Sequence, residues 1–232
     1  MKADQGKPEF DREVLDFYAD LNPGFRLPPG IELLNPFCEP ETIKSMDSFY
    51  RKFYHDSNPR FFIYGINPGR FGAGVTGIPF TDPIRLETDC GIKNSFRKVP
   101  ELSSVFIYKM IDAYGSVEKF YRNFFITAVC PLGFVKNNRN LNYYDQPDLL
   151  AQTRNFLIES IRKQLSWPVR TEACICLGEG KNFKQFSLLN AEFKFFRRII
   201  PLSHPRFIMQ YKRREMDRYI DRYLETFEQM KM

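Results

Sequence analysis

Four short apolar runs alternate with stretches of helical periodicity along this chain, and this alternation is the strongest constraint on its fold. The apolar runs predict strands at residues 60–65, 123–129, 173–177 and 195–202. The helical pattern predicts helices at residues 9–20, 40–55, 101–114, 147–165, 180–192 and 213–231. Strands that alternate with helices form a parallel sheet covered on both faces. We therefore expect an α/β fold, a three-layer α/β/α sandwich around a four-stranded parallel sheet.

The chain is long enough for one sizeable domain. It has 232 residues and ordinary hydrophobic (43%) and charged (27%) fractions. Since no linker, repeat or low-complexity tract divides it, we expect a single domain over residues 1–232. Residues 1–58 are expected to form an N-terminal helical and irregular arm packed on the rest. The prolines within residues 21–36 predict an irregular segment between two helices.

Composition argues against several classes of protein. No apolar run approaches the roughly 20 residues of a membrane helix, and residues 1–6 lack the apolar core of a signal peptide. We therefore expect a cytoplasmic protein with no membrane partner. Five scattered cysteines do not predict disulfides, and two histidines supply too few ligands for a zinc site. We therefore expect neither a zinc site nor an iron–sulfur cluster.

The charge balance is basic, with a net charge of +6, which is compatible with a polyanionic partner. A cluster of basic residues lies near the C-terminal helix and comprises Arg206, Lys212, Arg213, Arg214 and Arg218. Such a cluster is either a solvated helix face or a set of phosphate contacts. The sequence alone leaves both interpretations open.

The glycine-rich segment 65–80 lies at the end of the first predicted strand, and its residues are suited to binding a ligand. Its glycines allow backbone amides to approach a ligand closely. Asn67 offers a donor and an acceptor, and Phe80 offers a stacking face. The alternative is ordinary loop geometry, in which Asn67 is a turn residue before Pro68.

Three loops follow strand ends, at residues 67–80, 130–142 and 204–212. Because ligands bind at the carboxyl ends of the strands in such sheets, we expect these loops to form a single site. His204 is either a capping or core histidine or a neutral donor to developing negative charge. The asparagines of the second loop either face solvent or read a polar ring edge.

Residues 65–80 closely resemble the first motif of the single-strand-selective monofunctional uracil-DNA glycosylases, a family of the uracil-DNA glycosylase superfamily. Three further segments match the family in order and spacing, and the resemblance spans roughly residues 30–215. They are Cys130-Pro131-Leu132, Asn138-Arg139-Asn140-Leu141 and Leu202-Ser203-His204-Pro205.

The resemblance implies a DNA repair enzyme that flips a uracil, or another deaminated base, out of DNA and hydrolyses its N-glycosidic bond. The product is an abasic site, and no metal, cofactor or lyase step is needed. By position, Asn67 orients the attacking water, Phe80 stacks on the flipped base, and His204 stabilises negative charge on the uracil O2. The partner is single- or double-stranded DNA, and the protein is expected to be a monomer, associated with the nucleoid if bacterial.

The resemblance also assigns a wider set of site residues. Substrate contacts are expected from Gly65, Ile66, Pro68, Gly69, Phe71, Gly74, Pro79, Phe80, Thr127, Ala128 and Cys130. DNA contacts are expected from Arg139, Asn140, Arg206, Phe207, Gln210, Lys212, Arg213 and Arg214.

Two departures from the family pattern resemble those of a bacterial subgroup. The family places an asparagine that reads the uracil O4 and N3 edge where this chain has Ala128. Reading then passes to backbone groups of residues 65–80, to Thr127, or to an asparagine within 137–140, and we favour backbone groups with a supporting asparagine. We expect Ala128→Asn to sharpen base discrimination. The residues that follow His204 also differ from the family sequence. Arg206, Phe207 or Gln210 is expected to be the wedge that fills the space left in the DNA stack by the flipped base.

Two other functions remain open from the sequence. The first is a non-catalytic module that binds single-stranded nucleic acid on the same fold. The second is a nucleotide hydrolase that uses the glycine-rich loop for phosphates.

Overall fold

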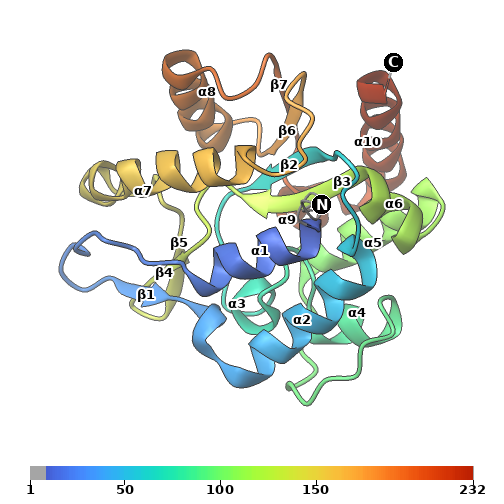
Figure 1. The fold of residues 1–232 in the computed structure, drawn as a ribbon, viewed down its shortest axis with the longest axis horizontal. Helices are drawn as coiled ribbons and strands as arrows, with labels where there is room; N and C mark the ends of the chain where they lie inside the picture. Colours follow the sequence, from blue (N-terminus) through green and yellow to red (C-terminus); the bar gives the residue numbers. More distant parts are fainter. Residues whose placement is uncertain (1–8, 232) are drawn as a thin grey trace, which may run out of the picture.

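The computed structural model describes residues 9–231 and has a four-stranded sheet at its centre (Figure 1). The strands are β2 (Phe61–Gly65), β3 (Phe124–Ala128), β6 (Cys174–Leu177) and β7 (Ile199–Leu202). Their order is β3-β2-β6-β7, and every neighbouring pair is parallel. The predicted parallel sheet is confirmed, although β7 begins at Ile199 rather than at residue 195.

Helices cover both faces of this sheet, so the three-layer α/β/α sandwich is confirmed. The long helices, all of them predicted, are α1 (Phe10–Ala19), α2 (Pro40–Tyr54), α5 (Leu102–Tyr114), α7 (Pro147–Leu165), α8 (Lys181–Phe193) and α10 (Met216–Lys231). The short ones are α3 (Ala73–Thr76), α4 (Pro83–Thr88), α6 (Val117–Asn123), α9 (Pro205–Tyr211) and the 3₁₀ turns η1 (Pro36–Cys38) and η2 (Arg213–Glu215). Figure 1 shows α7 and α8 on one side of the sheet and α6 and α10 on the other. No helix among residues 9–231 is long and apolar enough to span a membrane.

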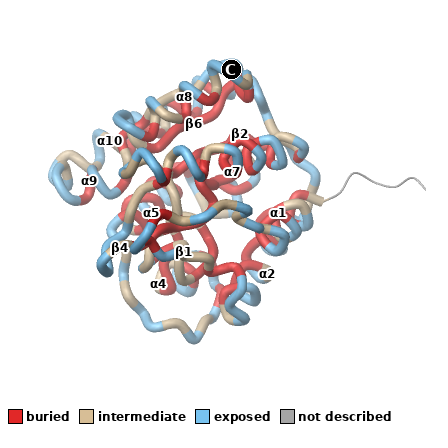
Figure 2. Tube along the Cα trace, turned by 90° about the vertical axis from the view of Figure 1, so that its left-hand side faces the viewer, coloured by how far each residue is buried: buried red, intermediate tan, exposed pale blue. Residues whose placement is uncertain are grey.

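Aromatic side chains fill the space between the layers. Phe62 and Phe125 are partners in register, and the ring of Phe10 from α1 contacts both. Phe124, the neighbour of Phe125 in β3, instead packs on Phe227 of α10, with ring centres 4.5 Å apart. Because successive side chains of a strand point to opposite faces, α1 and α10 lie on opposite sides of the sheet. Strands β2, β3 and β6 are buried along their whole length, and Figure 2 shows this for β2 and β6.

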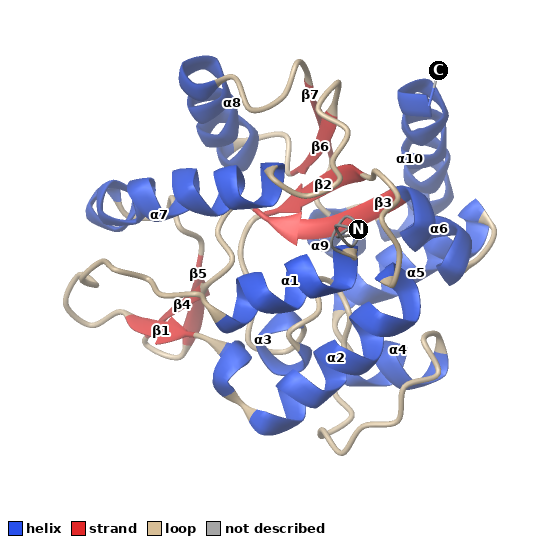
Figure 3. Ribbon diagram, in the orientation of Figure 1, coloured by secondary structure: helices blue, strands red, loops and turns tan. Residues whose placement is uncertain are grey.

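A small antiparallel sheet stands apart from the central one (Figure 3). Its order is β1-β4-β5, and its strands are β1 (Glu32–Leu34), β4 (Gly133–Lys136) and β5 (Arg139–Leu141). The sequence predicted an irregular arm over 21–36 and a loop over 130–142, so both predictions are wrong for these strands. Each strand has only three or four residues. Such short strands depend on their partners rather than on a pattern of their own.

The segment after His204 is helical, whereas the sequence predicted a loop over 204–212. Pro205 occupies the first position of α9, where its missing N–H costs no hydrogen bond. His204 is the N-cap, and its Nδ1 accepts the N–H of Arg206 at 3.1 Å. Helix α9 therefore starts directly at the carboxyl end of β7.

The carboxyl ends of the central strands meet at one edge of the sheet. Strands β2 and β3 end in register at Gly65 and Ala128, and β6 and β7 end in register at Leu177 and Leu202. The glycine-rich loop, the segment that leads to the β4–β5 hairpin, and His204 all leave from this edge. The fold thus brings together three segments that are far apart in the chain.

Candidate active site

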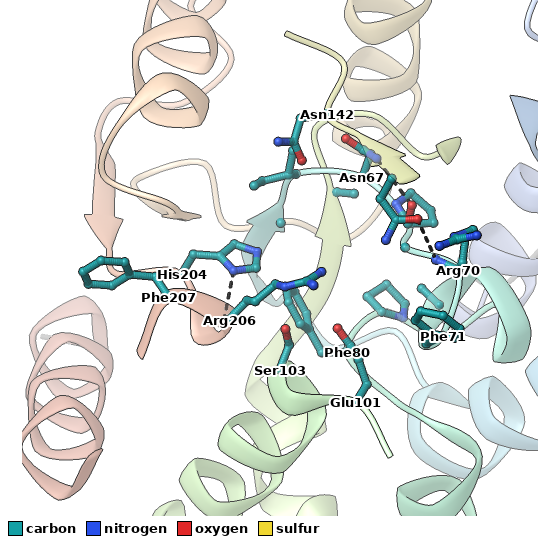
Figure 4. Close-up of a pocket in the computed structure, with 18 of the residues that line it drawn as sticks. Asn67, Arg70, Phe71, Phe80, Glu101, Ser103, Asn142, His204, Arg206 and Phe207 are labelled. Atoms are coloured by element: carbon teal, nitrogen blue, oxygen red, sulfur yellow. Dashed lines mark hydrogen bonds between the residues drawn. The ribbon is translucent and has the colours of Figure 1, made fainter. Parts of the chain in front are cut away.

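A cavity of about 610 Å³ opens at this edge of the sheet (Figure 4). The glycine-rich loop, the end of β3, the β5 region and α9 line it. Its volume falls within the roughly 300–1,000 Å³ of small-molecule sites. The three strand-end loops therefore contribute to one site, as the sequence predicted.

Most of the predicted site residues line this cavity. They are Gly65, Ile66, Asn67, Pro68, Gly69, Phe71, Pro79, Phe80, Thr127, Ala128, Arg139, Asn140, His204, Arg206, Phe207 and Gln210. The predicted residues that do not line it are Gly74, Cys130, Lys212, Arg213 and Arg214.

Gly74 and Cys130 shape the loops behind the cavity. The N–H of Gly74 donates to the Gly69 carbonyl at 2.9 Å, and a Cβ on Gly74 would lie 2.5 Å from that oxygen. Cys130 is buried, its thiol donates to the Leu132 carbonyl at 3.2 Å, and burial raises its pKa to about 12. Gly74 and Cys130 therefore support the cavity from behind, and a direct contact with the substrate stays a prediction for them.

The three basic residues lie beyond the cavity, in or next to η2. Lys212 Nζ forms an ion pair with Glu215 at 3.0 Å, and Arg218 approaches the other oxygen of the same carboxylate at 3.8 Å. Arg213 and Arg214 are exposed. Part of the predicted basic cluster is therefore neutralised by Glu215, and its position fits phosphates outside the cavity rather than a ligand within it.

His204 presents a neutral imidazole to the cavity. Since Nδ1 accepts the Arg206 N–H, the proton of the neutral ring lies on Nε2. Burial lowers the pKa of His204 to about 4, and the positive charge of Arg206 acts in the same direction. The residue is thus both a helix cap and a potential donor, so the two interpretations of the sequence are compatible.

Phe80 lies beside this imidazole, and its placement depends on Gly65. The two rings have centres 5.6 Å apart and planes inclined by 55°. A Cβ on Gly65 would lie 3.1 Å from the Phe80 ring and 3.3 Å from the Thr127 carbonyl. Phe80 itself has a φ of 53°, in the left-handed region. The glycine at the end of β2 therefore makes room for the aromatic wall of the cavity.

Asn67 holds two parts of the cavity wall together. Its Nδ2 donates to the Leu141 carbonyl at 3.1 Å, and its Oδ1 accepts the N–H of Tyr143 at 3.1 Å. Because one partner is an acceptor and the other a donor, the orientation of the carboxamide is fixed. Asn67 thereby fastens the glycine-rich loop to the turn after β5.

Arg70 makes a second connection between the same two segments. Its backbone N–H donates to Asn140 Oδ1 at 3.3 Å, and its guanidinium donates to Asn138. Thr127, by contrast, directs its hydroxyl away from the cavity, where it accepts a hydrogen bond from Gln164 of α7 at 3.2 Å. The hydroxyl of Thr127 therefore does not reach a ligand.

The structure adds residues that the sequence did not indicate, namely Arg70, Ala73, Glu101, Ser103, Asn142 and Tyr211. Burial raises the pKa of the Glu101 carboxyl, which accepts the Ser104 hydroxyl at 3.1 Å. Glu101 is the residue before α5 and follows no strand, so no pattern pointed to it. For Asn142, the only signal was its place at the end of the predicted loop 130–142.

One cluster of possible metal ligands occurs among residues 9–231, and it lies outside the cavity. His55 Nδ1 is 3.0 Å from Asp11 Oδ2 and 3.2 Å from Glu9 Oε2. Hydrogen bonding between the imidazole and the two carboxylates accounts for this arrangement without an ion.

Comparisons with known proteins agree with the motifs. The family model described as the uracil DNA glycosylase superfamily matches residues 52–228. The fold is similar to the crystal structure of wild-type SMUG2 from Pedobacter heparinus, with a TM-score of 0.94 and 48% sequence identity over 97% of this chain and 99% of that chain. A search of curated proteins gave no significant match. The resemblance found in the sequence is confirmed.

Proposed function

Because the chain belongs to the uracil DNA glycosylase superfamily, and within it to the single-strand-selective monofunctional family, it is a DNA repair glycosylase, and we propose that it excises uracil from DNA. The observation that carries the proposal is the meeting of Asn67, Phe80 and His204 in one cavity. These residues come from two different strand ends and are the three to which the family motifs assign the chemistry.

The target base must leave the DNA stack before it can enter this cavity. Extrusion costs a few kcal/mol in a duplex and less in a single strand or at a mismatch. Phe80 offers its ring to the extruded base, and α9 places Arg206, Phe207 and Gln210 along the cavity wall. One of these side chains fills the space that the base leaves.

His204 stabilises the leaving group. As the N-glycosidic bond breaks, negative charge develops on the uracil while the sugar becomes cationic. A neutral imidazole donates its Nε2–H to uracil O2 without bringing a charge that must be desolvated. By comparison with a single donor in an oxyanion hole, this contact contributes about 3–4 kcal/mol to the transition state.

Asn67 orients the attacking water. An amide does not accept a proton near neutral pH, so it cannot act as a general base. Its Oδ1 already accepts the Tyr143 N–H and retains one lone pair for a water molecule. Orientation suffices because the water attacks a sugar that is already cationic.

The composition of the cavity favours hydrolysis without a lyase step. An amine nucleophile would form a Schiff base with the abasic sugar. Within the described part of the chain, no lysine lines the cavity. We expect borohydride to trap no covalent complex between the protein and DNA.

The test is excision from an oligonucleotide that contains one uracil, followed by alkaline cleavage at the abasic product. We expect the wild type to produce abasic sites, and His204→Ala and Asn67→Ala each to lower the single-turnover rate at least tenfold. Folding of each variant is checked by circular dichroism. His55→Ala is the matched control, because His55 is the other histidine and lies outside the cavity.

Two results would contradict the proposal. Binding of DNA without abasic product would indicate a non-catalytic module, and turnover of free nucleotides alone would indicate a nucleotide hydrolase. Wild-type rates in both variants would show that the roles of Asn67 and His204 are wrong even if uracil is excised.

A further inference from the structure

We propose that the carboxamide of Asn142 reads the polar edge of the extruded base and replaces the amide that this chain lacks at Ala128. This inference rests on the proposed function, since it concerns the same cavity and the same substrate. It names the residue that determines base specificity.

The end of β3 offers no polar side chain for this task. Ala128 lines the cavity with a methyl group, which cannot form a hydrogen bond. Thr127, one residue earlier, points its hydroxyl toward Gln164 of α7. A base edge must therefore be read from another wall of the cavity.

The other asparagines near the cavity are engaged elsewhere. The carboxamide of Asn67 bonds to the Leu141 carbonyl and the Tyr143 N–H. Asn140 uses its Oδ1 to accept the Arg70 N–H and is exposed. Asn138 is bonded to the Arg70 guanidinium and does not line the cavity.

Asn142 differs from these residues. It is half-buried and lines the cavity, and its carboxamide forms no hydrogen bond within residues 9–231. Figure 4 shows this side chain on the opposite side of the cavity from Ser103 and Glu101. Its donor and acceptor are thus free for a ligand.

The backbone of Asn142 is held on both sides. Its N–H donates to Asp145 Oδ2 at 2.8 Å, and its carbonyl accepts the Asp145 N–H at 3.0 Å. The two bonds of Asn67 fall on Leu141 and Tyr143, the residues directly before and after Asn142. Because the backbone is fixed in this way, only the side-chain torsions of Asn142 must be ordered when it binds a base.

A carboxamide can match the polar edge of uracil, and in the orientation that does so it opposes cytosine. Nδ2–H can donate to uracil O4 while Oδ1 accepts the N3–H. Cytosine has an amino group in place of O4 and an acceptor at N3, so both contacts become repulsive. The carboxamide thus supplies both partners that the uracil edge requires, and in that orientation it disfavours cytosine.

The experiment compares Asn142→Ala and Asn142→Asp with the wild type in single-turnover excision of uracil. The aspartate keeps the size and the acceptor but loses the donor to O4, so we expect at least a tenfold lower rate in both variants. Affinity for DNA with a tetrahydrofuran abasic-site analogue is measured in parallel and should stay within twofold, because that DNA carries no base to read. Asn58→Ala, an exposed asparagine just before β2 at the other end of the strand from the cavity, is the control.

The outcomes separate this inference from the proposed function. If the wild type excises uracil and both Asn142 variants do so at the same rate, the inference is wrong and the proposed function stands. An equal loss of rate and of affinity for the abasic analogue would assign Asn142 a structural role and would also overturn the inference. If the wild type forms no abasic product, the proposed function fails and the inference fails with it.

Discussion

The two nitrogens of His204 have different tasks, which shows how single residues serve both the fold and the proposed chemistry. Nδ1 accepts the first free N–H of α9 at 3.1 Å. This contact fixes the proton on Nε2, which faces the cavity. Asn67 likewise combines two backbone contacts with a place in the cavity wall. At this scale, a structural interpretation of a residue does not compete with a functional one.

The first prediction concerns the titration of His204. Because burial lowers its pKa to about 4, we expect its imidazole to stay neutral from neutral pH down to about pH 5. The chain has two histidines, so NMR titration with His55→Ala identifies each ring directly. A His204 ring that titrates near 6.5 in the folded protein would contradict the assignment of a neutral donor.

The same shift predicts how stability depends on pH. The unfolded chain binds the proton near pH 6.5, whereas the folded chain binds it only near pH 4. The unfolded state therefore holds more protons in this window, and the free energy of unfolding falls as the pH drops from 6.5 toward 4. We expect His204→Gln to lose less stability over this range than the wild type in urea unfolding experiments.

Sequence reasoning found those site residues that follow a predicted strand within a specific motif. Asn67, Phe80 and His204 are of this kind. Asn142 and Glu101 could not be found in this way. Asn142 follows the short strand β5, which the sequence did not predict, and Glu101 precedes a predicted helix rather than following a strand. Gly74 and Cys130 belong to matched motifs but contact the protein itself. A motif therefore identifies a segment, whereas packing decides which of its residues face the ligand.

At the scale of secondary structure, helix α9 exposes two large aromatic side chains to solvent. Phe207 is 43% exposed and Tyr211 is 73% exposed, and their ring centres lie 5.6 Å apart. Both residues line the cavity. Exposed rings beside a basic surface are suited to insertion between bases or to stacking on them.

The second prediction assigns these rings to base extrusion. We expect Phe207→Ala and Tyr211→Ala to lower uracil excision from duplex DNA at least fivefold, with a smaller effect on single strands, because only the duplex requires a stacked base to be displaced. The measurement is the single-turnover rate on matched duplex and single-stranded substrates. Leu188→Ala, which removes a residue of α8 that is 56% exposed and outside the cavity, is the control. Equal losses on both substrates would exclude a wedge.

The third prediction concerns η2. Arg213 and Arg214 are exposed, whereas Lys212 is paired with Glu215. We expect the double variant Arg213→Gln/Arg214→Gln to bind DNA with a weaker salt dependence. The slope of the logarithm of the DNA-binding constant against the logarithm of salt concentration should fall in magnitude by about 0.9 for each lost phosphate contact. Lys212→Gln should change this slope less. Arg162→Gln/Lys163→Gln, in the last turn of α7, is the matched control. An unchanged slope in the Arg213/Arg214 variant would place η2 off the DNA.

The elements that the sequence predicted are those with enough residues to show a period. Helix α7 was predicted with both ends correct, and the pattern of α10 was clear over its whole length. The strands β1, β4 and β5 have three or four residues and were missed. Helix α9 carried a usable signal, since a proline that follows an N-cap residue is typical of a helix start. Its seven residues were too few for periodicity to add to that signal.

At the scale of the whole molecule, the two ends of the central sheet differ in character. The carboxyl edge holds the cavity, with glycines and polar side chains. The opposite edge holds Arg60, which is fully buried between the rings of Phe10 and Tyr54, each about 4.7 Å from its guanidinium carbon. Its guanidinium donates to both oxygens of Asp56 at 2.9 Å and to the Tyr121 carbonyl at 2.7 Å. Arg60 thus connects β2 to α1, α2 and α6.

The fourth prediction follows from this difference. Arg60→Met keeps an unbranched apolar stem but leaves Asp56 without its ion-pair partner and deprives buried carbonyls of a donor. We therefore expect the free energy of unfolding to fall by about 3–5 kcal/mol. The measurement is urea unfolding followed by circular dichroism. Arg12→Met, which removes an arginine whose side chain is 66% exposed, should change stability by about 0.5 kcal/mol or less.

Because Arg60 lies at the edge opposite the cavity, excision per folded molecule should stay within twofold of wild type at low temperature. A stable Arg60→Met protein with impaired excision would show that the two edges are coupled and would contradict this division of the sheet.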